Sequence, residues 1–230
     1  MTVHNDKKIA VFFDCENISA KYVQDIFNDL ANYGEVIIKK AYIDWSSQKP
    51  NGEWRLKVQE FALDPIQVFP NISQKNATDI KIVIDVMNTM VSSKSNIIAL
   101  VTSDSDFTDL AKDIKAKGIE ALGYGEKKTP SALRKAYSTF IQIPISGDCS
   151  LEEGKEDILT LLKEAVITTR GDNDYALISQ VGSYLKNKES SLIAKNFGGR
   201  TWGDIFKKYP KIFELSHLNN QKSVATVRIK

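Results

Sequence analysis

Short apolar runs alternate with amphipathic segments through the first part of the chain. Runs rich in Val, Ile and Phe predict buried strands, whereas apolar residues spaced three or four apart predict helices. The pattern predicts strands at Lys8–Phe13, Glu35–Ile43, Ile66–Phe69, Asn96–Thr102, Ile119–Gly123 and Thr139–Ile143. It predicts helices at Ser19–Ala31, Trp54–Leu63, Thr78–Met90, Phe107–Lys117 and Ser131–Ala136. The helix at Thr78–Met90 is predicted from one apolar stripe, formed by Ile80, Ile84, Met87 and Val91.

The order of these elements predicts a parallel α/β sheet that is covered by helices on both faces. Crossovers between such strands are nearly always right-handed. A polar stretch without periodicity, Ser146–Lys155, follows and is interpreted as a linker. The chain is therefore expected to hold an α/β domain over residues 1–145, a linker over residues 146–155 and a second domain over residues 156–230.

The second domain has its own pattern of three helices followed by a hairpin. The predicted helices are Glu156–Val166, Tyr175–Lys186 and Thr201–Lys208, and the predicted strands are Lys211–Leu215 and Val224–Ile229 around the turn His217–Lys222. Three helices and a hairpin are typical of a small winged-helix domain.

Composition bounds the cellular setting. The 230 residues carry 31 basic and 29 acidic side chains, so the net charge does not require a polyanionic partner, although a local basic face is compatible with it. The two cysteines, Cys15 and Cys149, have no metal-ligand spacing, which fits a reducing compartment. The polar N-terminus does not resemble a signal peptide, and no apolar stretch reaches the length of a membrane span. We expect a cytoplasmic protein without membrane contact.

Acidic residues follow two of the predicted strands. Asp14 ends the first strand, Asp104 and Asp106 follow the strand at Asn96–Thr102, and Asp79 opens a helix. Ligands of open α/β sheets bind beyond the carboxyl ends of the strands, so these side chains meet at one edge if the two strands are neighbours. Four carboxylates that close repel one another unless a cation neutralises them. Oxygen ligands without a nearby Cys or His favour Mg²⁺ or Mn²⁺, and a pair of such ions assists phosphodiester hydrolysis.

Each of these acids also has an ordinary structural explanation. Asp14, Asp104 and Asp106 could cap helices, and Asp79 could favour the dipole of its own helix. What favours a shared metal site is that all four fall on one edge of the sheet.

Other residues near the acids are open to two interpretations. Asp85 lies six positions after Asp79, is turned well away around the helix, and is assigned to a supporting or surface position. Glu16 is a second supporting candidate. Cys15 is more typical of a small buried residue than of a nucleophile, because no histidine is placed to activate it. Three residues of one segment could face a phosphate or belong to a solvated loop: Lys127, Lys128 and Ser131.

Four motifs together resemble the NYN family, a branch of the PIN-like metal-dependent ribonucleases that is also called LabA-like. They are FFDCENIS with Asp14 and Asn17, ATDIKIVID with Asp79 and Asp85, TSDSDF with Asp104 and Asp106, and TPSAL with Ser131. The resemblance covers residues 8–144 and implies a PIN-like or Rossmann-like parallel sheet with an acidic Mg²⁺ or Mn²⁺ pocket that cuts RNA.

The resemblance also assigns roles to residues. The four aspartates would be the catalytic and metal-binding groups, and Asn17 would orient the site or the scissile phosphate. Ser103 stands where the family usually has Gly, so it brings a side chain to the place where backbone approaches the metal and the substrate. Thr78 stands where Val is usual.

The C-terminal segments ALISQVGSYLKNK and IAKNFGGRTWGDIFKKYPKIFEL resemble an OST-HTH, or LOTUS, domain, a winged-helix module that is often attached to NYN nucleases. The resemblance implies RNA binding or protein docking. The candidate phosphate contacts are Lys186, Lys188, Lys195, Arg200, Lys207, Lys208 and Lys211, although any single lysine is more typical of a solvated face. Trp202, Phe206 and Phe213 are more typical of core residues than of base-stacking platforms.

The sequence thus leads to a first hypothesis and two rivals. The first is a metal-dependent ribonuclease whose C-terminal module helps to hold RNA. The second is an RNA-binding regulatory protein with a weak or inactive nuclease pocket. It is considered because Ser103 stands where the family usually has Gly. The third is a phosphatase with Asp14 as covalent nucleophile, which the paired Asp104 and Asp106 fit less well. The expected partners are RNA and, as open options, a protein docked on the C-terminal domain and a second copy in a homodimer.

Overall fold

The computed structural model describes residues 7–49, 52–69, 76–92, 94–145, 155–218 and 224–230. The chain forms two compact units, Met1–Pro144 and Ile145–Lys230. Residues 146–154 of the expected linker lie outside the described residues, and the first helix of the second unit begins at Lys155.

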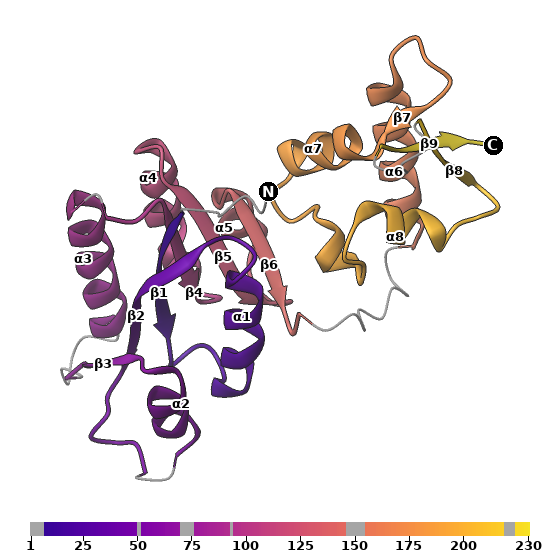
Figure 1. Ribbon diagram of the computed structural model, residues 1–230. Coiled ribbons are helices and arrows are strands. Elements are labelled where there is room, and N and C mark those ends of the chain that lie inside the picture. The colour runs from indigo at the N-terminus through magenta and orange to yellow at the C-terminus, as the bar shows by residue number, and fades with distance from the viewer. Residues whose placement is uncertain (1–6, 50–51, 70–75, 93, 146–154, 219–223) are drawn as a thin grey trace. The chain divides into compact units, whose positions relative to one another are not determined.

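The first unit is built on a six-stranded sheet in the order β3-β2-β1-β4-β5-β6, and every pairing is parallel (Figure 1). The strands are β1 (Lys8–Asp14), β2 (Glu35–Ile43), β3 (Asp64–Gln67), β4 (Ile97–Val101), β5 (Glu120–Glu126) and β6 (Thr139–Ile143). The chain first builds outward from β1 to β3 and then returns to the other side of β1 with β4. Because of this reversal, the carboxyl ends of β1 and β4 form the topological switch point, which is where α/β sheets bind their ligands.

Helices cover both faces of this sheet (Figure 1). The helices are α1 (Val23–Leu30), α2 (Glu53–Phe61), α3 (Ala77–Ser92), α4 (Thr108–Ala116) and α5 (Ser131–Ala136), with short 3₁₀ turns η1 (Ala20–Tyr22) and η2 (Ser105–Phe107). Residues of α3, α4 and α5 share one core with alternate strand residues such as Phe12 and Leu100. On the other face, the Phe13 ring lies 5.9 Å from the rings of Phe27 in α1 and Trp54 in α2. The predicted α/β class is confirmed.

The second unit packs three helices against a small antiparallel sheet in the order β7-β9-β8. Its elements are α6 (Lys155–Arg170), β7 (Ala176–Leu177), α7 (Ile178–Lys188), η3 (Ala194–Phe197), α8 (Trp202–Lys207), β8 (Phe213–His217) and β9 (Ala225–Ile229). The core residues include Leu162, Val181, Leu185 and Val227. A capping box between Thr201 and Asp204 starts α8. This is the helix-and-hairpin arrangement that the sequence predicts.

Several boundaries differ from the sequence-based prediction. Strand β3 begins at Asp64 and contains Pro65, which the edge position of β3 allows because an edge strand has one row of backbone groups without strand partners. The expected start of the helix at Tyr175 is wrong, because Ala176 and Leu177 instead pair with β9. A two-residue strand is too short to produce any periodicity in the sequence.

The orientation of α3 requires the largest correction. The stripe from which the helix is predicted faces solvent, with Ile80, Ile84, Met87 and Val91 all exposed. The opposite face packs on the sheet through Ile82, Val86 and Met90.

Within the described part of the chain, no helix combines the length and apolar character that crossing a membrane requires.

Tight packing beside the switch point leads to a prediction about Gly123 in β5. A Cβ atom added to Gly123 would overlap the buried ring of Tyr137. We expect Gly123→Ala to destabilise the first unit by about 1–3 kcal/mol, which is typical of overpacking. Urea unfolding checks this, with Gly203→Ala as the control, since its added Cβ would meet no atom closer than 3.4 Å. Equal losses for the two variants would contradict the packing explanation.

Candidate functional site

Asp14 ends β1 at the switch point and is almost fully buried, with 1% of its surface exposed. Its Oδ2 atom accepts hydrogen bonds from the Asn17 side-chain amide at 2.7 Å and from the Thr102 hydroxyl at 2.8 Å. Its Oδ1 atom accepts a longer bond of 3.3 Å from the Asn17 backbone N–H. Burial raises the pKa of Asp14 even though these hydrogen bonds favour the ionised form. The carboxylate is therefore held in place and poorly solvated.

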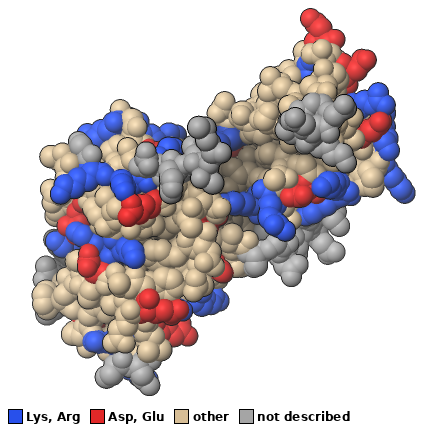
Figure 2. All heavy atoms as spheres, viewed as in Figure 1, with Lys and Arg blue, Asp and Glu red and all other residues tan. Residues whose placement is uncertain are grey.

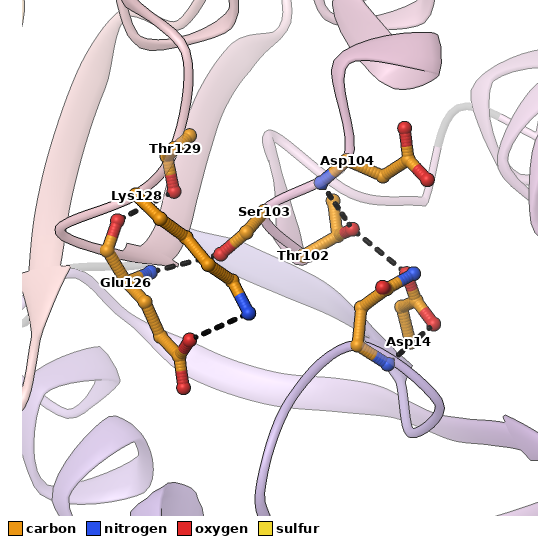
Figure 3. A network of polar contacts seen from close by, with 8 residues as sticks. Asp14, Thr102, Ser103, Asp104, Glu126, Lys128 and Thr129 are labelled. Carbon is orange, nitrogen blue, oxygen red and sulfur yellow. Dashed lines mark hydrogen bonds and ion pairs between the residues drawn. The ribbon is translucent and has the colours of Figure 1, made fainter.

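Thr102, directly after β4, links Asp14 to the second acidic segment. Its hydroxyl donates to Asp14 and also accepts the backbone N–H of Asp104 at 3.1 Å. Figure 3 shows this hydroxyl between the Asp104 amide and the Asp14 carboxylate. Asp104 in turn accepts the backbone N–H of Asp106 at 3.0 Å and caps η2. One buried hydroxyl thus fixes the ends of two neighbouring strands relative to each other.

Asp79 brings a third segment into the same region. It lies in the first turn of α3 and is partly exposed. Its pKa is raised to about 6, first by burial and then by the negative charges of Asp14, Asp104, Asp106 and Glu16. A carboxylate responds to other charges in this way only when they are close. The prediction that β1 and β4 are neighbours is confirmed, and Thr102 links the ends of both strands, where Asp14 and Asp104 lie.

The remaining predicted site residues lie in two different places. Asn17 contacts Asp14 directly. Ser103 is buried, and its hydroxyl accepts the backbone N–H of Glu126 at the end of β5, so that its side chain points away from Asp14 (Figure 3). Lys128 forms an ion pair with Glu126 at 2.9 Å. Lys127 is exposed in the same turn, and Ser131 is exposed at the start of α5.

Cys15 is buried and its pKa is raised well above the ordinary value, first by burial and then by the charge of Asp14. A protonated, buried thiol is a poor nucleophile. This agrees with the interpretation of Cys15 as a small buried residue.

Asp85 is buried beside polar partners in the first unit. The surface position considered for it from the sequence is therefore wrong. It is 8% exposed and accepts hydrogen bonds from the Tyr42 hydroxyl at 2.8 Å and from Lys40 at 3.0 Å. Lys81, one turn earlier in α3, lies 3.5 Å from it. Burial acts to raise the pKa of Asp85, but the bonds from Tyr42 and Lys40 and the lysine charges outweigh it, so the pKa is lowered.

The acidic residues suit a hard divalent cation by their chemistry, since all four offer carboxylate oxygens. Burial and then the charges of the other acids raise the pKa of Asp79. Across the described residues, however, no group of three or more His, Cys, Asp or Glu side chains is close enough to hold an ion. Asp79 and Asp104 are only partly buried and Asp106 is exposed.

Thr102 is the residue of the candidate site that the sequence did not indicate. Its only signal was its place two positions after Leu100, on the same face of the strand as the core and Asp14. We expect Thr102→Val to lower stability by about 1–3 kcal/mol, because it leaves the Asp14 carboxylate and the Asp104 amide each short of a partner. Thr102→Ser, which keeps the hydroxyl, should recover most of this loss in urea unfolding. A loss for Thr102→Ser as large as that for Thr102→Val would contradict a dominant role of the hydroxyl.

Basic residues of the second unit fall into two groups. Lys188 pairs with Glu164 at 2.7 Å, Lys207 lies 3.8 Å from Asp204, and Lys208 donates to the carbonyls of Phe197 and Gly198. The exposed remainder includes Lys186, Arg200 and Lys211. Figure 2 shows that Lys and Arg lie beside Asp and Glu on the visible face of each unit, without a field of one sign. As predicted, Trp202, Phe206 and Phe213 are core residues.

Fold and site together define an α/β domain with an acidic cluster at its switch point, followed by a winged-helix unit. The family model of the NYN domain matches residues 8–146, and that of the OST-HTH/LOTUS domain matches residues 149–224. The chain belongs to the NYN family and carries a C-terminal OST-HTH/LOTUS domain. This membership indicates a nuclease with an RNA-binding module.

A solved structure supports the fold alone. A protein of unknown function from Vibrio parahaemolyticus is similar with a TM-score of 0.51 at 18% identity, over 62% of this chain and 96% of the Vibrio chain. No match to the chain is found among curated proteins.

Proposed function

We propose that the first unit is a Mg²⁺- or Mn²⁺-dependent ribonuclease that hydrolyses RNA phosphodiester bonds at the acidic cluster. Asp14 and Asp104 are the innermost metal ligands, and Asp79 and Asp106 complete the pocket or position water. The observation that carries this proposal is that the Thr102 hydroxyl joins the Asp14 carboxylate to the backbone of Asp104. In support, burial and then the negative charges of the other three aspartates raise the pKa of Asp79 to about 6. Such repulsion is relieved when a divalent cation binds between the carboxylates.

The residues of the chain contribute position and charge. A bound Mg²⁺ or Mn²⁺ supplies an activated water and neutralises charge on the phosphate. Thr102 and Asn17 hold the Asp14 carboxylate in one orientation, so that binding costs it little side-chain freedom. Asn17 is exposed and lies beside Asp14, where its amide can orient the scissile phosphate. Ser103 does not obstruct the acids, because its hydroxyl is directed to Glu126.

For the second unit we propose a role in holding RNA, with docking of a protein as the alternative. Lys186, Arg200 and Lys211 are exposed and are the best candidates for phosphate contacts. In the first unit, Lys127 and Ser131 are exposed near the end of β5 and are candidates for substrate contacts, whereas Lys128 already pairs with Glu126.

The experiment that tests this function is a titration of RNA cleavage with Mg²⁺ and Mn²⁺, on structured and unstructured RNA, with the full chain. Cleavage that rises with either ion and stops with a chelator supports the proposal. Absence of products at saturating metal would contradict it.

A second candidate is an RNA-binding regulator with a weak or inactive pocket. It is favoured by one observation: among the described side chains, no three potential ligands are close enough to hold an ion. Binding of labelled RNA, measured with and without Mn²⁺, separates the two candidates. Tight binding that leaves the RNA intact after long incubation favours the regulator.

A further inference from the structure

Helix α3 is apolar on two opposite faces. One face packs on the sheet through Ile82 and Val86, which are 2% and 0% exposed. The other presents a stripe of four large apolar side chains to solvent: Ile80 at 52%, Ile84 at 49%, Met87 at 38% and Val91 at 82% exposure. An apolar helix face normally packs against another element, and contiguous exposed apolar patches mark interaction sites. Helix α3 lies at the outside of the first unit in Figure 1.

The stripe itself contains no charged residue. At 3.6 residues per turn the four side chains lie within one narrow sector of the helix, flanked by Val83 on one side and Asn88 on the other. The charged residues of α3 lie at its sides, about a quarter turn or more from the centre of the stripe: Asp79, Lys81 and Asp85. Lys81 and Asp85 also pair with each other. The stripe residues themselves therefore neither repel a second copy nor select a charged partner.

We propose that the α3 stripe is the interface between two copies of this chain, with the two helices antiparallel about a two-fold axis. The stripe residues are separated by four, three and four positions, a spacing that is the same in both directions. An antiparallel pairing therefore sets Ile80 opposite Val91 of the partner subunit and Ile84 opposite Met87 of the partner subunit. A two-fold interface uses the same patch on both subunits, and this symmetric spacing meets that condition.

The exposed area fits a weak dimer. With roughly 180 Å² for a fully exposed side chain of this size, the four exposed fractions give roughly 400 Å² of apolar surface per subunit. A standard interface buries about 800 Å² per partner, of which about 57% is non-polar, or about 450 Å². The apolar area of the stripe is therefore close to the non-polar area of a standard interface, whose remaining area is polar. We therefore expect a reversible dimer with a dissociation constant in the micromolar range.

Sedimentation equilibrium of the full chain from about 1 to 300 μM tests the proposal across this expected range. The wild type should pass from monomer to dimer as its concentration rises. Ile84→Lys and Met87→Glu should each weaken dimerisation at least tenfold, because each places a charge opposite an apolar residue across the axis. Leu56→Lys is the matched control, since Leu56 in α2 is 53% exposed and lies outside the stripe. It should dimerise as the wild type does.

The antiparallel register has its own test. An equal mixture of the Ile84→Lys and Met87→Glu variants should form a heterodimer more tightly than either variant dimerises alone, because the new ammonium and carboxylate face each other across the axis. A wild type that stays monomeric throughout would overturn the proposal and leave the stripe to another protein or to the second unit. Dimers unaffected by both stripe variants would also overturn it. Neither measurement uses RNA cleavage, so its outcome is independent of the proposed function.

Discussion

Replacing Asp14 with asparagine is expected to reduce RNA cleavage by about 10³-fold or more, which corresponds to about 4 kcal/mol of transition-state stabilisation. Asp14 is the most buried of the four aspartates and the one whose orientation is fixed by two side chains from separate segments. Asparagine preserves the shape and can still accept hydrogen bonds from Thr102 and Asn17, but it lacks the charge that a divalent cation requires.

The same substitution should not destabilise the fold. Burial raises the folded-state pKa of Asp14 above its ordinary value of 3.8, so the ionised side chain costs stability at neutral pH, and this cost disappears below that value. At pH 7 without metal, Asp14→Asn should be at least as stable as the wild type in urea unfolding. Asp25→Asn, at an exposed position in the first turn of α1, is the control; it should leave cleavage unchanged and lower stability by less than about 1 kcal/mol. Equal cleavage rates for wild type and Asp14→Asn would remove the proposed site.

Asp85→Ala is expected to have the opposite profile, with a large loss of stability and little loss of cleavage. The substitution leaves the fully buried Tyr42 hydroxyl and the half-buried Lys40 ammonium without their acceptor. Leaving such buried polar groups without a hydrogen-bond acceptor lowers the free energy of unfolding by about 2–4 kcal/mol. Cleavage measured well below the unfolding temperature should stay within a few-fold of wild type, because Asp85 contacts none of the four aspartates at the switch point.

The stabilisation from Asp85 should depend on pH. Its folded-state pKa lies below the ordinary 3.8, so its contribution is fully present above that value and is lost as the pH falls through the folded-state pKa. The stability difference between wild type and Asp85→Ala should therefore shrink under strongly acidic conditions. Asp109→Ala is the control, because the Asp109 side chain is 93% exposed, and it should change stability by less than about 0.5 kcal/mol. A difference that is independent of pH would contradict this explanation.

Much of the first unit could be predicted because its signals are local. Buried parallel strands are continuous apolar runs, so β1 and β4 are clear in KIAVFF and NIIALVT. Acids directly after two such strands identify a sheet edge, and that edge becomes a site only because β4 pairs with β1. The pairing of β4 with β1 depends on the tertiary structure, and the sequence supported it only through the expected topology of the sheet.

The side of α3 that packs on the sheet could not be predicted from its apolar pattern. The exposed stripe is more apolar than the buried face, which includes Thr78, Asp85 and Thr89. The buried face is chosen by contacts from elsewhere in the chain, since Asp85 must meet Lys40 and Tyr42 of β2. Periodicity finds a helix but does not distinguish a face that meets the sheet from one that meets another molecule.

Anomalous diffraction from a crystal of the full chain soaked in Mn²⁺ tests the central claim most directly. The claim is that carboxylates of β1, α3 and the segment after β4 share a divalent cation. We expect a manganese peak within coordination distance, about 2.0–2.4 Å, of oxygen atoms of Asp14 and Asp104, with Asp79 or Asp106 turned toward it. A fully soaked crystal with no peak between these side chains, or with peaks only elsewhere, would contradict the account.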